Sequence, residues 1–252
     1  MATLPGVDLH SHLAPQLDGW ARNANGLLLI DGHLVGPPAL FRPDRLEDYL
    51  DAADLDEAIV TIPPPFFRQD LSRPDAHGWV RAVNDGLLRA LDGHDRLTLL
   101  AHLPLEHPEV ALDEYTRLRD EEAWAGLTAS AGGGSVSLAD PALAPLWKVL
   151  DEDGRTLLLH PGTSPDPRLR PFYLSNLLGN PAETALAAAQ LVFGDVLARH
   201  PRLRFVLVHC GGLLPTVVGR RQRGTDTCRP GLPPDRIPAR RGAPLLRRLP
   251  RP

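Results

Sequence analysis

Six short apolar runs, separated by longer amphipathic or polar stretches, limit this 252-residue chain to a few architectures. Each run is long enough for a buried strand and each intervening stretch for a helix, the pattern of repeated β/α units around a parallel sheet. The runs are GVDLH (6–10), EAIVTI (57–62), LTLLAHL (97–103), WAGLTAS (124–130), RTLLLH (155–160) and RFVLVH (204–209). We therefore predict an α/β fold, a TIM-type (β/α) barrel with about six β/α units.

Helices are predicted between these runs, at about 43–54, 74–92, 108–122, 141–153 and 183–200. The first four stretches carry proline near the start, where the missing N–H costs nothing. In Asn180-Pro181-Ala182-Glu183, the sequence predicts Asn180 as an N-cap and Glu183 as the acidic member of a capping box.

Histidine ends three of the predicted strands. His10 ends the first run and His12 lies two residues further on, so both imidazoles point the same way in an extended chain. His160 ends RTLLLH and His209 ends RFVLVH, and β/α barrels have their active sites where the carboxyl ends of the strands meet. Imidazoles without thiolates suit Zn²⁺, with Mn²⁺, Fe²⁺ and Co²⁺ as alternatives. We predict a site for one divalent ion at this end of the barrel.

Several segments resemble the amidohydrolase-related family typified by amino-carboxymuconate-semialdehyde decarboxylase: VDLHSHLAP, LLLHPG, LLGNPAETALAAAQLVFGDVLARHPRLRFVLVHCGG and LLPTVVGRR, within residues 5–220. The resemblance implies that His10, His12 and His160 ligate zinc, and that His209 is a catalytic residue that positions or deprotonates water on the metal. It also implies a small carboxylate substrate, with nonoxidative decarboxylation of an unsaturated or aromatic acid as the favoured reaction. A metal-dependent hydrolase of a small C–N or C–O substrate is the alternative.

Two features depart from this family pattern. The namesake binds its substrate carboxylate with an arginine that has no counterpart in HLVGPPAL, so Arg42 or Arg45 would have to replace it. The family's eighth strand ends in a metal-binding aspartate, whereas Asp226 in RGTDTCRP follows RRQRG and no apolar strand. Two more β/α units would need about 50 to 80 residues. We therefore expect an incomplete barrel whose C-terminal part is missing or frameshifted, with an inactive remnant that binds metal or a partner subunit as a third hypothesis.

Residues 220–252 differ in composition from the rest of the chain. They hold ten arginines and two aspartates, many prolines and little hydrophobic periodicity, although the net charge of the whole chain is −4. This composition predicts a barrel domain over 1–219 and a disordered tail over 220–252. A basic tail could bind nucleic acid, but aromatic residues are not interleaved and the rest of the chain is acidic. No nucleic-acid partner is predicted.

The remaining expectations concern location and association. The chain has neither a run of about 18 uncharged apolar residues nor a signal-peptide pattern, so we predict no membrane partner and a cytoplasmic location. Cys210 and Cys228 are too few for a disulfide framework, which fits a reducing compartment. An open barrel has two unpaired edges that favour pairing with another chain, including a homo-oligomer. His102, at the end of the third run, is equally compatible with a pocket and with a barrel wall.

Overall fold

A parallel six-stranded sheet forms the centre of the protein, in the order β1-β5-β6-β7-β8-β9. The structure is a computed structural model that describes residues 6–17, 21–22, 25, 28–30, 32–121, 123–132, 136–162 and 164–228. The strands of this sheet are β1 (Val7–His12), β5 (Glu57–Thr61), β6 (Leu97–His102), β7 (Trp124–Ala131), β8 (Thr156–Pro161) and β9 (Arg204–Leu207). The predicted α/β fold of an incomplete β/α barrel is confirmed.

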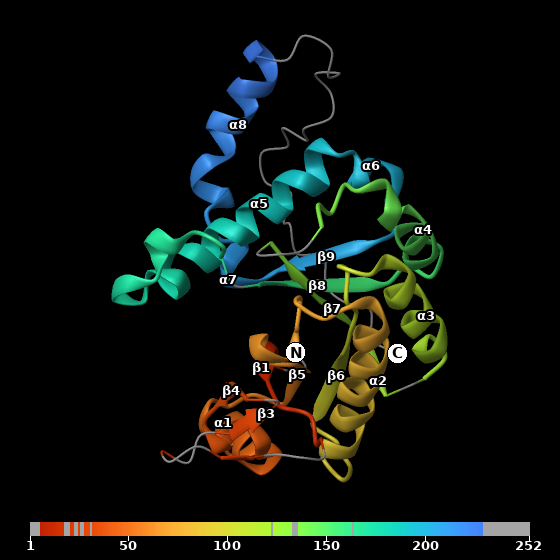
Figure 1. Ribbon diagram of the computed structural model, residues 1–252, viewed down its shortest axis with the longest axis vertical. Coiled ribbons are helices and arrows are strands. Elements are labelled where there is room, and N and C mark those ends of the chain that lie inside the picture. Colours follow the sequence, from red (N-terminus) through yellow and green to blue (C-terminus); the bar gives the residue numbers. More distant parts are fainter. Residues whose placement is uncertain are drawn as a thin grey trace, which may run out of the picture.

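Helices occupy the connections between these strands. They are α1 (Pro43–Ala52), α2 (Arg73–Ala90), α3 (Pro108–Leu118), α4 (Ala144–Glu152), α5 (Asn180–Phe193), α6 (Val196–Arg199), α7 (Val208–Gly211) and α8 (Leu214–Cys228). Figure 1 shows α2, α3 and α4 in succession along the outside of the sheet, α5 over β8 and β9, and α8 projecting away from the rest. Within the described part of the chain, no helix is both long enough and apolar enough to cross a bilayer.

Within the residues that the structure describes, six shorter helical turns complete the connections. Five are 3-10 turns, η1 (Pro38–Phe41), η2 (Pro64–Phe66), η3 (Pro141–Leu143), η4 (Pro167–Leu169) and η5 (Pro171–Tyr173). The sixth, η6 (Ser175–Gly179), is a π-helical turn that leads directly into α5. All five 3-10 turns begin at a proline, because its fixed φ and missing N–H suit the first position of a helix.

A small antiparallel sheet lies between β1 and α1, and the sequence analysis did not predict it. Its strands are β2 (Ala21–Arg22), β3 (Leu28–Ile30) and β4 (His33–Gly36), in that order. Strands of two to four residues are too short to show the alternation that identifies a strand in a sequence. Val35 of β4 joins the main hydrophobic core, which attaches this sheet to the rest of the fold.

The two faces of the parallel sheet bury different clusters. The outer face packs against the helices in one large core that includes Leu99, Leu157 and Leu159. The inner face carries a smaller cluster formed by Leu100, Leu158 and Val208, with Ile59 and Val206 packed against it. Strands buried on both faces have no polar side, which explains why the sequence shows them as continuous apolar runs.

The start of α5 differs from the prediction. Asn180 is not an N-cap, because the chain reaches it through η6 with helical backbone angles, φ −59° and ψ −55° at Gly179. An N-cap residue needs non-helical angles so that its side chain can accept a hydrogen bond from the first turn. The short motif does not reveal that a helical turn precedes it.

The last described helix covers the boundary predicted between the barrel domain and the tail. α8 continues across residue 219, so the predicted end of the barrel domain lies inside a helix. The rest of the predicted tail, residues 229–252, lies outside the described residues.

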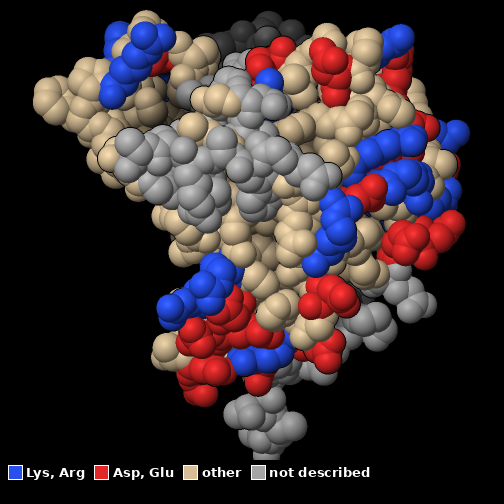
Figure 2. Space-filling model, turned by 60° about the horizontal axis from the view of Figure 1, so that its bottom comes forward, with Lys and Arg blue, Asp and Glu red and all other residues tan. Residues whose placement is uncertain are grey.

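Ion pairs between helices reinforce the outer layer. Arg73 and His77 of α2 pair with Glu109 and Asp113 of α3, and Arg117 of α3 pairs back to Asp85 of α2. They are spaced by four positions on α3 and by four and then eight positions on α2, so they form one row along the seam. Figure 2 shows acidic and basic side chains interleaved over one face of the molecule. Exposed pairs of this kind contribute little stability individually, and the buried core carries the fold.

The two glycines of α2 should respond in opposite ways to substitution by alanine. A Cβ at Gly78 meets nothing within 4 Å, whereas a Cβ at Gly86 would lie 2.6 Å from the carbonyl oxygen of Gln16. Gly78→Ala should raise the free energy of unfolding by about 1 kcal/mol through helix propensity. Gly86→Ala should lower it by about 1 to 3 kcal/mol, because the segment after β1 must move. Urea unfolding of the two variants checks this, and equal stabilisation by both would contradict the packing of that segment on α2.

Candidate metal centre

A bulge in β1 places the first two histidines. The register shifts between Asp8, opposite Ala58, and Ser11, opposite Val60. The Asp8 carboxylate accepts hydrogen bonds from the backbone N–H of His10 at 2.9 Å and from the Ser11 hydroxyl at 3.0 Å. These bonds hold the extra residue of the bulge in place, and bulges of this kind often re-aim side chains at functional sites. The His10 and His12 rings consequently lie with their centroids 4.8 Å apart.

His160 reaches this pair from the far side of the sheet. Four strand spacings separate β1 from β8 in the sheet order, a distance of about 19 Å if the sheet were flat. The His160 ring centroid nevertheless lies 5.1 Å from those of both His10 and His12. The sheet must therefore curl as in a barrel, and this curvature creates the cluster.

The three histidines present ligand atoms to one another. One ring nitrogen from each can be chosen so that all three lie within 4.8 Å of one another, and among the described residues they form a group able to hold one ion. The Nδ1 atoms of His12 and His160 lie 3.1 Å and 3.0 Å from the carbonyl oxygens of Ile62 and Pro161. A neutral imidazole that donates from Nδ1 leaves the lone pair of Nε2 free for a metal. Nε2 of His10 is buried without a hydrogen-bond partner, which also fits a ligand atom.

Burial keeps these imidazoles neutral. Burial, followed by the neighbouring His12 and His209, lowers the pKa of His10 to about 4. The pKa of His160 falls to about 3 through burial and then through the charge of His12, and burial also lowers the pKa of His12. Only a neutral imidazole offers a lone pair to a metal ion, so the cluster is ready to bind a cation at neutral pH.

His209 joins the cluster from outside the strand in which it was expected. β9 ends at Leu207, and His209 follows in the short α7 with a left-handed φ of 52°. The prediction that strand six runs through residue 209 is therefore wrong. The His209 ring centroid still lies 5.6 Å from that of His10 and 5.5 Å from that of His160. Burial lowers its pKa.

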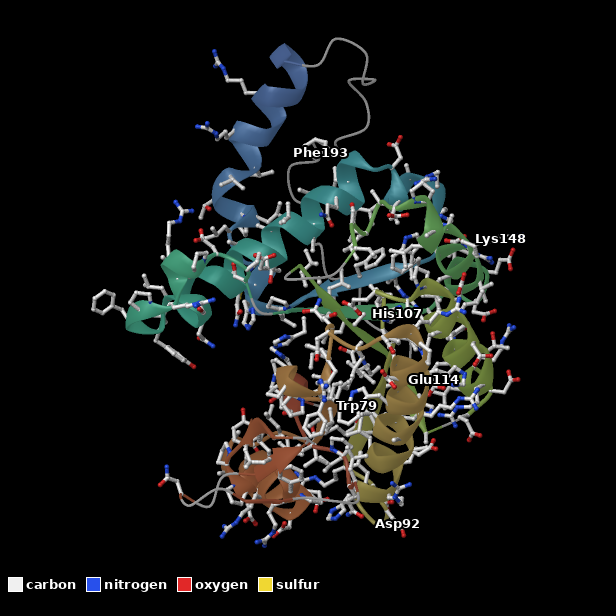
Figure 3. The ribbon with its side chains drawn as sticks, viewed as in Figure 1. Trp79, Asp92, His107, Glu114, Lys148 and Phe193 are labelled. Carbon is white, nitrogen blue, oxygen red and sulfur yellow. The ribbon has the colours of Figure 1, made fainter. Side chains whose placement is uncertain are left out.

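The loop after β5 supplies site residues that sequence reasoning missed. Phe67 is buried, and its ring centroid lies 5.7 Å from that of His160. Trp79 of α2, labelled in Figure 3, stacks on Phe66 and donates its indole N–H to the Phe66 carbonyl oxygen. The guanidinium of Arg68 lies over the same indole. Two adjacent phenylalanines after a predicted strand could have indicated these site residues. Apolar residues at such a place are equally typical of the hydrophobic core.

A polar network next to His160 was also missed. Ser130 of β7 lies opposite His160 in the strand register. Its hydroxyl donates to Oε1 of Glu106 at 2.8 Å, and the amide of Gln69 donates to the same oxygen at 2.8 Å. This network ties together the segments that follow β5 and β6 and the end of β7. It fixes the wall of the site on the side of the Phe67 loop.

His102 lies at the end of β6. It is completely buried beside Phe67, and burial lowers its pKa to about 3. Its backbone N–H donates to the side chain of Asn84, which donates back to the His102 carbonyl oxygen. Both ring nitrogens of His102 are buried without a hydrogen-bond partner among the described residues, so the structure does not decide between the pocket and a barrel wall with a satisfied hydrogen bond.

The other sequence candidates lie away from the cluster or outside the description. Arg42 binds Asp44, and Arg45 binds Asp48, so both proposed carboxylate binders have acidic partners on α1. Asp226 lies in α8, but its side chain is not among those described.

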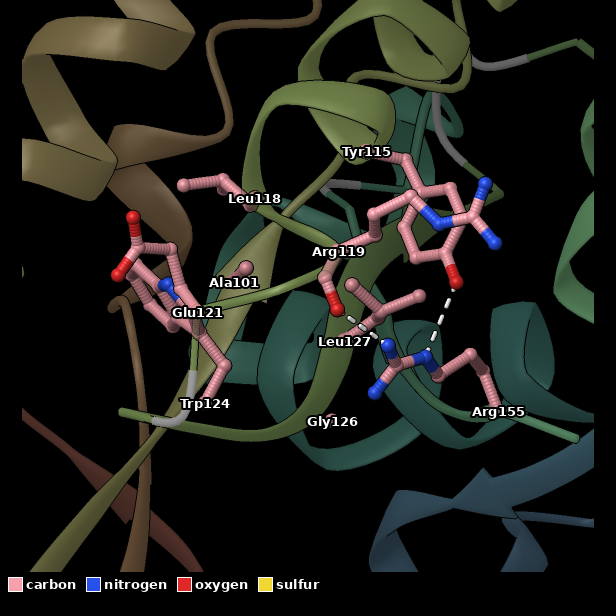
Figure 4. A pocket seen from close by; sticks show the side chains of 9 residues that line it. All are labelled: Ala101, Tyr115, Leu118, Arg119, Glu121, Trp124, Gly126, Leu127 and Arg155. Carbon is pink, nitrogen blue, oxygen red and sulfur yellow. Dashed lines mark hydrogen bonds between the residues drawn. The ribbon is translucent and has the colours of Figure 1, made fainter. Parts of the chain in front are cut away.

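Figure 4 shows a separate shallow hollow at the opposite ends of the strands, between α3 and the starts of β7 and β8. Arg155 there bonds to Tyr115 and to the Arg119 carbonyl oxygen, which are also in the lining.

The fold and the histidine cluster together define a β/α protein with a group of three histidines that could hold a metal ion at the carboxyl ends of its strands. Its sequence is more specific. The chain belongs to the amidohydrolase family, whose pattern matches residues 7–230.

Relatives with known names are decarboxylases. The chain is 26% identical over 245 residues to the 2-amino-3-carboxymuconate-6-semialdehyde decarboxylase of Dictyostelium discoideum, covering 90% of this chain and 68% of that protein. It is 32% identical over 238 residues to a 6-methylsalicylic acid decarboxylase of Aspergillus aculeatus, covering 91% and 69%. It is 27% identical over 186 residues to the gamma-resorcylate decarboxylase of Rhodococcus jostii, covering 68% and 56%. The chain thus spans 56% to 69% of the length of these relatives.

Solved structures share the fold. The apo form of IDCase from Metarhizium anisopliae superimposes with a TM-score of 0.75 at 23% identity, covering 88% of this chain and 70% of that one. A 2,6-dihydroxybenzoate decarboxylase in complex with 2,6-dihydroxybenzoate gives a TM-score of 0.73 at 23% identity, covering 92% and 75%.

The buried histidines should make the metal-free protein sensitive to mild acid. His10, His102 and His160 stay neutral in the fold, whereas an unfolded chain protonates histidine near pH 6.5. The unfolded state therefore binds more protons below that pH, and the free energy of unfolding should fall as the pH drops from about 6.5 to about 4. Each such group contributes at most about 1.4 kcal/mol per pH unit.

The His102→Phe variant isolates one of these groups. Urea unfolding in EDTA at several pH values should show a shallower loss of stability for this variant than for the unmodified chain. Identical pH profiles would show that His102 is not held neutral in the fold.

Proposed function

We propose that this protein is a metal-dependent nonoxidative decarboxylase of a small unsaturated or aromatic carboxylic acid. The observation that carries the proposal is the convergence of three neutral imidazoles, with His209 beside them, at the carboxyl ends of the strands. The names of the relatives support this reaction, since they act on 6-methylsalicylic acid, gamma-resorcylate and 2-amino-3-carboxymuconate-6-semialdehyde. All three substrates named there are unsaturated acids, and two are aromatic.

His10, His12 and His160 would hold the ion. A ligand set of imidazoles without thiolate suits Zn²⁺, which we propose as the resident ion, with Mn²⁺, Fe²⁺ and Co²⁺ as alternatives. Manganese has support from two neighbours, a dihydroxybenzoic acid decarboxylase from Polaromonas and a 5-carboxyvanillate decarboxylase from Novosphingobium aromaticivorans, both described with bound manganese. The bound ion would supply positive charge that orients an anionic substrate and stabilises charge on its oxygens.

His209 is the residue we propose for proton transfer. In nonoxidative decarboxylation the C–C bond to the carboxylate breaks, CO₂ leaves, and the electron pair that stays on carbon takes a proton. An imidazole suits this delivery because its pKa lies near neutral pH and it can take a new proton from solvent. His209 is less buried than His160, which leaves it a route to solvent. The other three imidazoles are committed to the ion in this arrangement.

Metal content tests the ligand assignment. The purified chain should carry about one ion, and the His10→Ala/His12→Ala variant should lose most of it, because one imidazole cannot replace three. His77→Ala is the matched control, since His77 is exposed on α2 and pairs with Asp113 away from the cluster. Elemental analysis gives the metal-to-protein ratio. Full metal content in the double variant would overturn the assignment.

Product analysis tests the reaction. The metal-loaded protein should release CO₂ from at least one member of a panel of hydroxybenzoic, methylsalicylic and unsaturated amino acids. His209→Ala should lower kcat by about 10² to 10⁴ while leaving metal content unchanged. Hydrolysis of an amide or lactone without CO₂ release would favour the hydrolase alternative. Metal binding without turnover of any compound would favour the inactive remnant.

A further inference from the structure

The backbone around His209 adopts an unusual conformation. Four consecutive residues have left-handed φ angles: 52° at His209, 54° at Cys210, 79° at Gly211 and 60° at Gly212. The first two carry side chains, for which this region is costly, and such backbone persists only where its surroundings impose it. β9 cannot impose it alone, because the strand ends at Leu207 and pairs only with β8.

The first turn of α5 contacts the end of this left-handed segment. The carbonyl oxygen of Pro181 accepts a hydrogen bond from the backbone N–H of Leu213 at 3.1 Å. A Cβ at Gly212 would lie 2.2 Å from that oxygen and 2.9 Å from the carbonyl carbon of Pro181. These atoms are backbone, so no rotamer change could relieve the overlap. Only glycine allows the two segments to approach this closely.

α5 is itself anchored to the body of the sheet. Ala187 and Leu191 belong to the main hydrophobic core, and the side chain of Glu183, two residues after Pro181, is buried. Glu183 also packs against Gly132 at the end of β7, where a Cβ would lie 2.2 Å from its carboxylate. The first turn of α5 therefore contacts the segments that follow β7 and β9. The core contacts and the contact with Gly132 fix α5 relative to the sheet independently of its contact with the left-handed segment.

We propose that the backbone contact between Pro181 and Gly212 positions the His209 imidazole at the metal centre. Gly212 and Pro181 are then positioning residues that act through His209, and the inference rests on the role proposed for that residue. The contact fixes the chain three residues after His209, while β9 fixes it two residues before. Between these two points the left-handed segment has little freedom, which keeps the ring within 5.6 Å of its neighbours His10 and His160. The proposal assigns a function to Pro181 in the segment GNPAET (179–184), which contains none of the predicted metal ligands.

Gly212→Ala and Gly211→Ala form a matched pair of variants. Both glycines have positive φ, so alanine is strained at either position, and Gly212 adds a ψ of −130° that disfavours alanine further. They differ in space, because a Cβ at Gly211 meets nothing closer than 3.9 Å. Crystal structures of both variants should show the His209 ring displaced by about 1 Å or more in Gly212→Ala and unmoved in Gly211→Ala.

Kinetics separates positioning from a general loss of structure. A misplacement of about 1 Å can cost about 10²-fold in rate, so Gly212→Ala should lower kcat by about that factor, with KM and metal content kept. In a His209→Ala background the same substitution should cause no further loss, because its effect passes through the imidazole. A purely structural role would lower metal content or thermal stability, and would lower kcat equally in both backgrounds.

Pro181→Gly tests the same contact if Gly212→Ala does not fold. Pro181→Gly frees the φ of residue 181 and loosens the carbonyl without an overlap, so it should shift His209 in the same direction by a smaller amount. An imidazole that stays within about 0.5 Å of its original place in the variant that folds would overturn the inference. If the unmodified protein releases no CO₂, the proposed function fails, and the crystal structures still decide whether the contact positions the ring.

Discussion

Curvature of the parallel sheet is the constraint on which the candidate site depends. β1 and β8 lie four strands apart, yet their histidine rings approach to 5.1 Å. No local sequence motif can produce that approach, because it follows from the twist and tilt accumulated over all the strands between them. The inner face of the same sheet carries a small apolar cluster that includes Leu100 and Leu158. The histidine cluster therefore depends on the curvature of the whole sheet.

Much of this arrangement could be predicted from the sequence. The apolar runs identified the six parallel strands, most clearly β7 and β8, which are buried along almost their whole length, and the prolines identified most helix starts because proline suits the first turn. Histidines at strand ends could be assigned to one end of the barrel because parallel strands share a direction. The predicted cluster of His10, His12 and His160 needed only that rule and the curvature of the fold, although their role as ligands stays a prediction.

The remaining features depend on contacts between distant segments. The small sheet before α1 has strands too short to show a pattern, and η6 precedes Asn180 without a signal in the motif. Strand six was predicted to include His209 because its apolar run continues to Val208, but the backbone has positive φ angles from His209 to Gly212 and the strand ends at Leu207. Phe67 and Glu106 were missed because each lies in a loop whose path depends on the neighbouring strands. Tertiary contacts decided each of these positions.

The central claim is that histidines from opposite sides of a curled sheet share one ion. X-ray absorption spectroscopy of the zinc-loaded protein measures this directly, because scattering from imidazole rings and from sulfur differs. The account predicts three imidazole nitrogens at about 2.0 to 2.1 Å from each zinc, with any further ligands being oxygen. A single imidazole bound to the zinc, or the Cys210 sulfur at about 2.3 Å from the zinc, would contradict it and would place the ion outside the curved interior of the sheet.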